Sequence, residues 1–278
     1  MAFPRRHNPD PALLDYVECI WTAERLFAPP NDSFTVLPDS FVELIFSFGP
    51  SLSIDDGHSL RPAPRCYVVG LLDKPFQIRA NGIVKTVAVR FHPWGFFPLF
   101  SITPEPSART IASAALKASL QNLTDSIQQA VESDQTERAV MLLNEYLLSR
   151  LRNGNPRRDV TQVASQRLMS RKGQLRTDDL AIQSDVSRRQ LERGFRKQIG
   201  SSPKQLARRI RFEQVRNRLF FEPDVGLAEL AYACGYADQA HMNREFKVFS
   251  NRTPKQFVAD MQLNRTWFRT QGVAFLQD

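Results

Sequence analysis

The chain has 278 residues, a hydrophobic content of 42% and a formal net charge of +8. This length predicts two domains, and the apolar content excludes a disordered chain. The longest apolar runs are too short to cross a bilayer and no signal peptide is visible, so we expect a cytoplasmic protein without membrane association. Its three cysteines, Cys19, Cys66 and Cys234, lack CxxC spacing and are expected to be reduced thiols.

The charge is distributed unevenly along the chain. Residues 1–150 contain 13 Lys+Arg against 16 Asp+Glu, a net of −3, whereas residues 171–263 contain 18 against 11, a net of +7. A mildly acidic front half joined to a basic back half indicates that only the back half meets a polyanion. The alternative at this point is a solvated basic surface without a partner.

The front half is expected to mix helix and strand. "PALLDYVECIW" spaces Leu13, Leu14, Val17 and Trp21 at helical intervals, which predicts a helix. Strands are predicted in "SFTVLPD", "FVELIFSFG", "RCYVVGL", "PFQIRA" and "VKTVAVRFHP". In the last of these, apolar residues at 87, 89 and 91 alternate with other residues, which is typical of a half-buried strand. After Pro104 the pattern becomes helical, and Pro and Gly between the strands favour an antiparallel sandwich or barrel.

"RNGNPRRD" is the clearest break in the pattern, because it contains Gly and Pro but no apolar residue. We therefore expect a β-rich domain over residues 1–153 and a linker over 154–159. An all-helical domain is expected over 160–263, followed by a tail over 264–278. The fold class expected is α+β with two domains.

The helical half contains an internal repeat. "DDLAIQSDVSRRQLERGFRKQIGSSPKQL" matches "AELAYACGYADQAHMNREFKVFSNRTPKQF", with one residue inserted in the second copy. Leu180 corresponds to Leu230 and Phe195 to Phe246, and both copies end on Pro-Lys-Gln. Self-similarity over about thirty residues is far stronger evidence than a single motif.

Each copy has the pattern of a helix-turn-helix. A short helix carries Leu-Ala on its buried side, and a polar residue, Ser187 or Asp238, can then cap a second helix. The second helix is expected over residues 187–199 in the first copy and 238–249 in the second. In each of these helices the apolar residues lie four apart, so only one stripe is buried. The outward positions are Arg188, Arg189, Glu192, Arg193 and Arg196, and in the second copy Gln239, Ala240, Asn243, Arg244 and Lys247.

These outward residues suit recognition of base edges. Arginine can bond to guanine in two places, and Asn and Gln match adenine. Between the copies, "SPKQLARRIRFEQVRNRLFF" begins with Ser before Pro, a strong helix start. One helix of this length would run about 30 Å, close to the distance of about 34 Å between successive major grooves on one face of DNA. The arginines along this connector are candidates for phosphate contacts, with solvation of the helix as the alternative for some of them: Arg208, Arg209, Arg211, Arg216 and Arg218.

The two motifs together resemble the DNA-binding domain of AraC/XylS-type bacterial transcription regulators. "GYADQAHMNREFK" followed by "TPKQF", with the upstream "SRRQLERGF" and "SPKQL", carries the resemblance over about residues 158–262. It implies sequence-specific binding of double-stranded DNA in successive major grooves, with base contacts from Arg189, Glu192, Arg193, Gln239, Ala240, Asn243 and Arg244. Ala240 can at most touch a thymine methyl. Phosphate contacts are expected from Ser187, Arg188, Arg196, Lys197, Arg208, Arg209, His241 and Lys247.

The first copy departs from the family pattern at two positions. Asp185 stands where the turn usually has Gly and must adopt a left-handed or nearby conformation, which Asp tolerates better than most residues. Gly194 lies inside the first reader helix, where Gly costs roughly 0.5–1 kcal/mol relative to Ala. We therefore expect this helix to be the less rigid of the two.

The front half resembles the all-β, cupin-like sensory domains attached to this family, in one uncharacterised branch. "VLPDSFVELIFSFG", "VVGLLDKPFQIRANG" and "VAVRFHPWGFFPLFSI" carry this resemblance. It implies binding of an unidentified small-molecule effector, dimerisation, or both, and RNA polymerase is a further candidate partner. The sequence leaves open whether the protein is a monomer or a homodimer.

An enzymatic function is not expected. His7, His58, His92 and His241 are isolated, without HxH, HExxH or Cys/His pairs, so no metal, cofactor or catalytic residue is predicted. Cys234 is interpreted as core filler. "FHPWGFFPLF", with Arg90, His92 and Trp94, is either a ligand lid or a strand end with packed aromatics. The alternative function is a non-enzymatic binding or interaction module with a degenerate helix-turn-helix domain.

Overall fold

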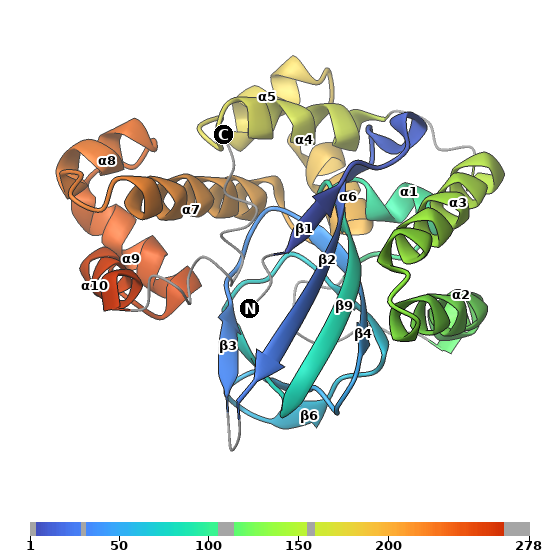
Figure 1. The fold of residues 1–278 in the computed structure, drawn as a ribbon. Helices are drawn as coiled ribbons and strands as arrows, with labels where there is room; N and C mark the ends of the chain where they lie inside the picture. Colours follow the sequence, from blue (N-terminus) through green and yellow to red (C-terminus); the bar gives the residue numbers. More distant parts are fainter. Residues whose placement is uncertain (1–3, 29–31, 105–113, 155–158, 264–278) are drawn as a thin grey trace.

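The computed structural model describes residues 4–28, 32–104, 114–154 and 159–263, and its strands, which lie between Arg5 and Phe91, form two antiparallel sheets. We call residues 5–91 the β-domain (Figure 1). The first sheet has the order β1-β2-β9-β4-β7, and the second β3-β8-β5-β6. The strands are β1 (Arg5–His7), β2 (Val17–Phe27), β3 (Ser33–Val36), β4 (Val42–Phe48), β5 (Ser53–Asp55), β6 (Leu60–Pro62), β7 (Cys66–Val69), β8 (Phe76–Arg79) and β9 (Gly82–Phe91).

The predicted helix at residues 11–21 is wrong. Only Pro11–Leu13 forms a short 3-10 helix, η1; residues 14–16 form a turn, and β2 begins at Val17. This strand pairs with β9 from Val17 opposite Phe91 to Phe27 opposite Gly82. Pairing over the full length of a strand satisfies its backbone hydrogen bonds, so the tertiary partner overrides the local periodicity.

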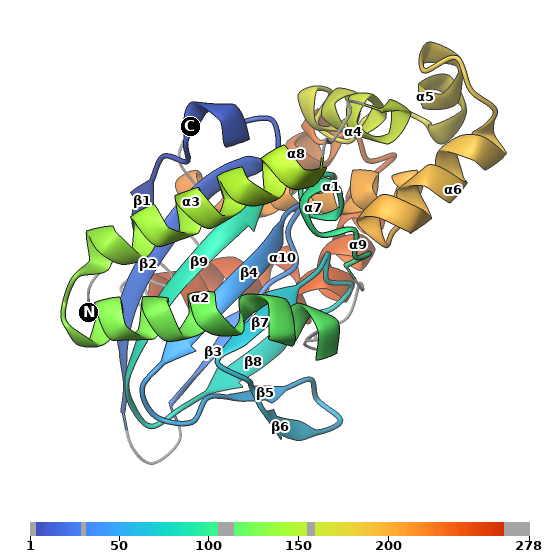
Figure 2. The same cartoon turned by 90° about the vertical axis from the view of Figure 1, so that its right-hand side faces the viewer.

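The five strands predicted in this half are confirmed, but β9 is not half-buried. Val87, Val89 and Phe91 belong to a core beneath helices, whereas Val84 and Ala88 belong to the core between the two sheets. Both faces of β9 are therefore covered. Figure 2 shows α2 and α3 crossing the outer face of the five-stranded sheet. The interior between the sheets is filled by side chains that include Phe27, Tyr67 and Phe76.

Every secondary-structure element after β9 in the described chain is a helix, and turns and loops join these helices. They are α1 (Phe96–Phe100), α2 (Ala114–Glu132), α3 (Thr136–Gly154), α4 (Val160–Ser170), α5 (Thr177–Gln183), α6 (Arg188–Ile199), α7 (Pro203–Phe221), α8 (Leu227–Ala233), α9 (Gln239–Ser250) and α10 (Pro254–Leu263). The α+β fold class is confirmed. Residues 155–158 of the predicted linker and the whole predicted tail lie outside the described residues.

Among the described residues, no helix combines the length and apolarity that a membrane span requires. The helices α4, α5 and α6 form a first helical unit, and α8, α9 and α10 form a second (Figure 1). Both units pack on α7. The first unit shares one apolar core with the β-domain and with α1–α3, whereas the second has a core of its own.

Candidate nucleic-acid interface

The first helical unit contains a helix-turn-helix in which the turn depends on Asp185. Leu180 and Ala181 of α5 are buried, and Asp185 has a φ of 52°, the left-handed conformation expected for this position. Ser187 then caps α6: its hydroxyl accepts a hydrogen bond from the Gln190 backbone N–H, while the Gln190 side chain accepts one from the Ser187 N–H. This capping box fixes where the first reader helix begins.

The second unit repeats this arrangement with different capping chemistry. Leu230 and Ala231 of α8 are buried, and Gly235 occupies the left-handed turn position with a φ of 74°. The Asp238 carboxylate accepts a hydrogen bond of 2.6 Å from the His241 backbone N–H and so caps α9. Met242 and Phe246 are fully buried. Both predicted reader helices are therefore helices, and both begin after the predicted cap.

The outer faces of α6 and α9 carry the residues assigned to base contacts. Five of the seven are exposed, and the remaining two, Glu192 and Asn243, are partly exposed. Glu192 accepts a 3.0 Å hydrogen bond from Arg188, which also donates to Asp178 at 3.1 Å. The exposed five are Arg189, Arg193, Gln239, Ala240 and Arg244.

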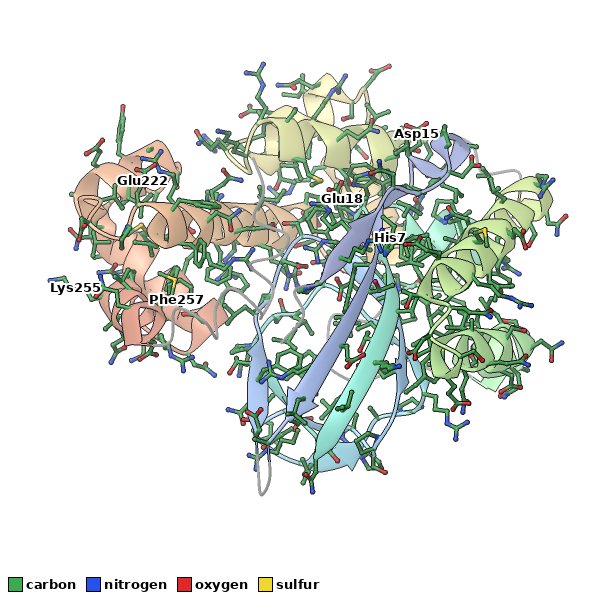
Figure 3. The ribbon with its side chains drawn as sticks, in the orientation of Figure 1. His7, Asp15, Glu18, Glu222, Lys255 and Phe257 are labelled. Carbon is green, nitrogen blue, oxygen red and sulfur yellow. The ribbon has the colours of Figure 1, made fainter. Side chains whose placement is uncertain are left out.

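The residues assigned to phosphates divide into three groups. Ser187, Arg188, Arg196, Lys197 and Lys247 are exposed, and His241 is partly exposed. Arg208 is partly exposed, but its guanidinium donates a 2.6 Å hydrogen bond to Glu245 of α9 and so joins α7 to the second reader helix. Figure 3 shows the side chains of the second unit, where Lys255 of α10 projects away from the protein and Phe257 is buried.

The assignment of Arg209 to a phosphate is wrong. Its side chain is fully buried, and its guanidinium donates to the backbone oxygens of Leu71 and Leu72 in the β-domain. It also donates to Ser201 and Asp73. Burial lowers the pKa of Arg209 to about 10, and Asp73 opposes this change. The sequence showed one more arginine on a basic helix, and nothing local distinguished it from an exposed one.

Glu245 is a positioning residue that the sequence analysis missed. It lies on the buried side of α9 and accepts hydrogen bonds from Arg208 and Arg211. Its partners lie 37 and 34 residues upstream in the sequence, so no local spacing indicates the pairing. Glu245 therefore anchors the second reader helix on α7.

Two family models match the chain, one in each half. The family described as "Helix-turn-helix domain" matches residues 180–260, and "Domain of unknown function (DUF6597)" matches residues 5–110. The chain belongs to the AraC family of helix-turn-helix transcription regulators. This family is non-enzymatic.

Two transcriptional regulators of Pseudomonas aeruginosa are similar to this AraC-family chain. The HTH-type transcriptional regulator CdhR of Pseudomonas aeruginosa is 26% identical over 183 residues, which is 60% of this chain and 53% of CdhR. The regulator GbdR of the same species is 31% identical over 78 residues, 28% of this chain and 21% of GbdR. The chain thus spans about half the length of CdhR and less of GbdR.

A solved structure of ToxT from Vibrio cholerae is also similar. It is 11% identical, with a TM-score of 0.46, and the match covers 86% of this AraC-family chain and 98% of ToxT.

Gly194 of this AraC-family protein, which the sequence marks as a weak point of α6, has a packing reason. It faces α4, and a Cβ built on it would lie 2.6 Å from Thr161 Oγ1. Contacts this short do not occur without movement, so glycine permits α4 and α6 to approach each other. Its place opposite Thr161 also means that it does not belong to the outward, reading face of α6.

We expect Gly194→Ala to destabilise the protein despite the better helix propensity of alanine. Overpacking costs about 1–3 kcal/mol, whereas the propensity gain is about 0.5–1 kcal/mol, so a net loss is expected in urea denaturation. In a Thr161→Ala background the obstructing Oγ1 is gone, and the same change should become neutral or stabilising. Equal effects in both backgrounds would contradict a steric role for Thr161.

The region read as either a ligand lid or packed aromatics is packed in this AraC-family structure. His92 stacks on Trp94 with ring centroids 4.8 Å apart, and Trp94 donates a 2.8 Å hydrogen bond to the Asp15 backbone oxygen. Arg90 is buried between Asp39 and Glu43. Burial lowers the pKa of His92, so the ring is neutral near pH 7. This favours the packed-aromatic interpretation.

The cysteines and histidines of the described chain form no reactive cluster. Cys234 is buried, and burial raises the pKa of its thiol, as expected for core filler. Cys19, Cys66 and Cys234 are all unpaired. Within the described ranges, no group of three or more His, Cys, Asp or Glu side chains is arranged to hold a metal ion.

Proposed function

We propose that this protein is a sequence-specific DNA-binding transcription regulator that inserts α6 and α9 into successive major grooves of one duplex. The observation that carries the proposal is a pair of equivalent, capped helix-turn-helix units at the two ends of α7, each with a polar outer face. The 19 residues of α7 span about 28 Å at 1.5 Å per residue. This length is compatible with grooves about 34 Å apart, because the reader helices extend beyond the ends of the connector.

Within this proposal the exposed outer residues divide by chemistry. Arg189, Arg193 and Arg244 bond to guanine edges, Gln239 and Asn243 to adenine, and Glu192 accepts from cytosine. Ala240 touches a thymine methyl. Phosphate contacts come from Ser187, Arg188, Arg196, Lys197, His241 and Lys247, and from Arg208 if it exchanges Glu245 for a phosphate. Residues 160–263 are the reading part of the chain.

Selection of DNA from a random pool tests this proposal. The full-length protein should enrich a sequence with two blocks, and its affinity for that sequence should exceed that for scrambled DNA by about 10³-fold or more at physiological salt. The affinity should fall steeply as salt is raised, because phosphate contacts release counterions. No enrichment at physiological salt would instead support the alternative, a module with a degenerate helix-turn-helix. Asp185 and Gly194, the residues that motivated that alternative, both have structural roles in the first unit.

The β-domain regulates DNA binding in this proposal, through a small-molecule effector, dimerisation, or both. Support comes from the direct contacts of β-domain loops with α7, through which a change in the β-domain would reach both reading units. RNA polymerase is the partner expected at a promoter. A thermal-shift screen of small molecules on the full-length protein, followed by DNA titration with each hit, tests the effector. Sedimentation with and without DNA determines whether the active form is a monomer or a dimer.

We expect Arg244→Ala to relax specificity at about one base position and to cost about 1–3 kcal/mol of binding free energy on the selected DNA. Arg244 is exposed on α9, so the change should leave the fold intact. Lys247→Ala on the same helix is the matched comparison, and it should weaken all sequences similarly. Fluorescence anisotropy on a set of single-base variants measures both. An equal loss on every base variant for Arg244→Ala would contradict its role in base recognition.

A further inference from the structure

The two helical units have separate apolar cores that meet on α7. Leu206, Ala207 and Ile210 belong to the core shared by the first unit and the β-domain. Phe212 and Val215 belong to the core of the second unit. The boundary falls at Arg211, in the middle of the helix. Because side chains of different cores do not interlock, apolar packing alone leaves this joint weakly restrained.

Polar contacts bridge the joint in the described chain. Arg211 donates a 3.0 Å hydrogen bond to the Gly173 backbone oxygen of the first unit, and it also pairs with Glu245 of the second. Gln174 donates to the Ala233 backbone oxygen at 3.1 Å. Hydrogen bonds of this kind at a partly exposed joint compete with water and restrain it only modestly.

Two loops of the β-domain hold α7 on either side of this joint. We call residues 37–39 and 71–73 the clamp loops. On the first side, Arg209 donates to Leu71 O at 3.1 Å, Leu72 O at 2.8 Å and Asp73 Oδ1 at 2.7 Å. The guanidinium is fully buried, and Ser201 of the first unit accepts a further hydrogen bond from it at 2.8 Å. These hydrogen bonds fix the guanidinium relative to the β-domain loop and relative to Ser201.

On the second side, the other clamp loop contacts both α7 and the second unit. Arg216 is buried and donates to the Pro38 backbone oxygen at 3.4 Å. The neighbouring Leu37 packs against the core of the second unit. Asp39 is itself fixed by Arg90 of β9. Arg209 and Arg216 lie seven residues apart and therefore on one face of α7, the face that lies on the β-domain.

From these contacts we infer that the clamp loops set the relative position of the two reader helices, with Arg209 and Arg216 as positioning residues. The β-domain is bound to each unit on its own side of the joint, so it bridges the place where the apolar cores separate. The spacing of the two DNA half-sites that the protein accepts then depends on the β-domain as well as on α7. This inference rests on the proposed function where it concerns DNA, but the positioning itself does not.

Distances between spin labels measure the positioning without DNA. Ile182 and Tyr232 occupy equivalent positions in the two units and are 78% and 86% exposed, so Ile182→Cys and Tyr232→Cys place labels in both units. The native thiols at 19 and 234 are buried, and the protein without the added cysteines, labelled in parallel, reports any reaction at Cys66. The wild-type background should give one narrow distance distribution in double electron–electron resonance.

Arg209→Met should broaden this distribution, whereas Arg138→Met should not, since Arg138 is an exposed arginine on α3 remote from the joint. Leu37→Ser tests the other clamp loop without altering α7. Circular dichroism shows whether each variant folds, and Leu37→Ser replaces Arg209→Met in the test if Arg209→Met does not fold. Broadening in either folded clamp variant supports the inference. A broad distribution in the wild type, or distributions as narrow in the folded clamp variants as in the wild type, would overturn it.

The DNA consequence is tested on the sequence that the wild type selects. One base pair inserted between its two blocks turns the second block by about a tenth of a helical turn and moves it along the axis. The wild type should lose about tenfold in affinity on this DNA, and Arg209→Met about threefold or less. An unchanged penalty overturns the inference for DNA. If the wild type selects no DNA, the proposed function fails, while the label distances still decide whether the clamp loops position the units.

Discussion

Arg90→Met is expected to lower the free energy of unfolding by about 3–5 kcal/mol at neutral pH, because it leaves two largely buried carboxylates, whose side chains are 22% and 16% exposed, without their cation. Arg90 on β9 is 3% exposed and donates to Asp39 at 2.5 Å and to Glu43 at 2.8 Å. Methionine fills a similar volume, so the loss reports the charge rather than a cavity. Urea denaturation measures it.

The loss caused by Arg90→Met should depend on pH. Burial raises the pKa of Glu43, and Arg90 opposes this rise. Without Arg90 the pKa of Glu43 in the folded state rises further above the unfolded value of about 4.3. A raised folded pKa means that stability is fully present below the unfolded pKa and is lost as pH rises through the folded pKa. The difference from wild type should therefore be smaller at about pH 4.5 than at about pH 7.5.

Arg79→Met is the matched control for Arg90→Met. Arg79 on β8 also pairs with an aspartate, Asp55, at 2.7 Å, but its side chain is 41% exposed. An exposed pair of this kind contributes about 0–1 kcal/mol, so the change should be small and nearly independent of pH. A loss for Arg90→Met that equals the control, or that grows in acid, would refute the role assigned to this buried cluster.

Phe246→Ala is expected to cost about 3–5 kcal/mol and to remove DNA binding through the second unit. The ring is 1% exposed and lies against Phe212 and Phe257, with centroids 5.1 Å and 5.4 Å away. Its removal leaves a cavity under α9, so the reader helix loses the surface that supports it.

The separate cores predict where the damage from Phe246→Ala will appear. The second unit has its own core, so hydrogen exchange should accelerate in α8, α9 and α10 while the β-domain keeps its protection. Val248→Ala on the same helix is the control, because Val248 is 46% exposed and its truncation should change stability by less than about 0.5 kcal/mol. Uniform loss of protection over the whole chain would contradict an independent second core.

The sequence alone determined the helix-turn-helix units. The caps Ser187 and Asp238, the left-handed position of Asp185 and the buried pairs four residues apart are local signals. Helix geometry converts such spacings directly into faces, and a cap depends only on residues within one turn. The duplication then confirmed each signal with a second copy, and the start of α7 at Ser202 followed from the same rules.

Only the tertiary structure decided which residues outside these motifs face water. Residues 11–21 have a helical spacing, yet the chain from Val17 onward is a strand because β9 offers ten residues of partner backbone. Arg208 and Arg209 are neighbours on a basic helix, yet one is partly exposed and the other fully buried. The β-domain partners of Arg209 lie more than 130 residues away, so its role depends on contacts that no local pattern contains. Long-range pairing and burial are properties of the assembled chain, and these two properties separate an arginine open to solvent from one held inside the protein.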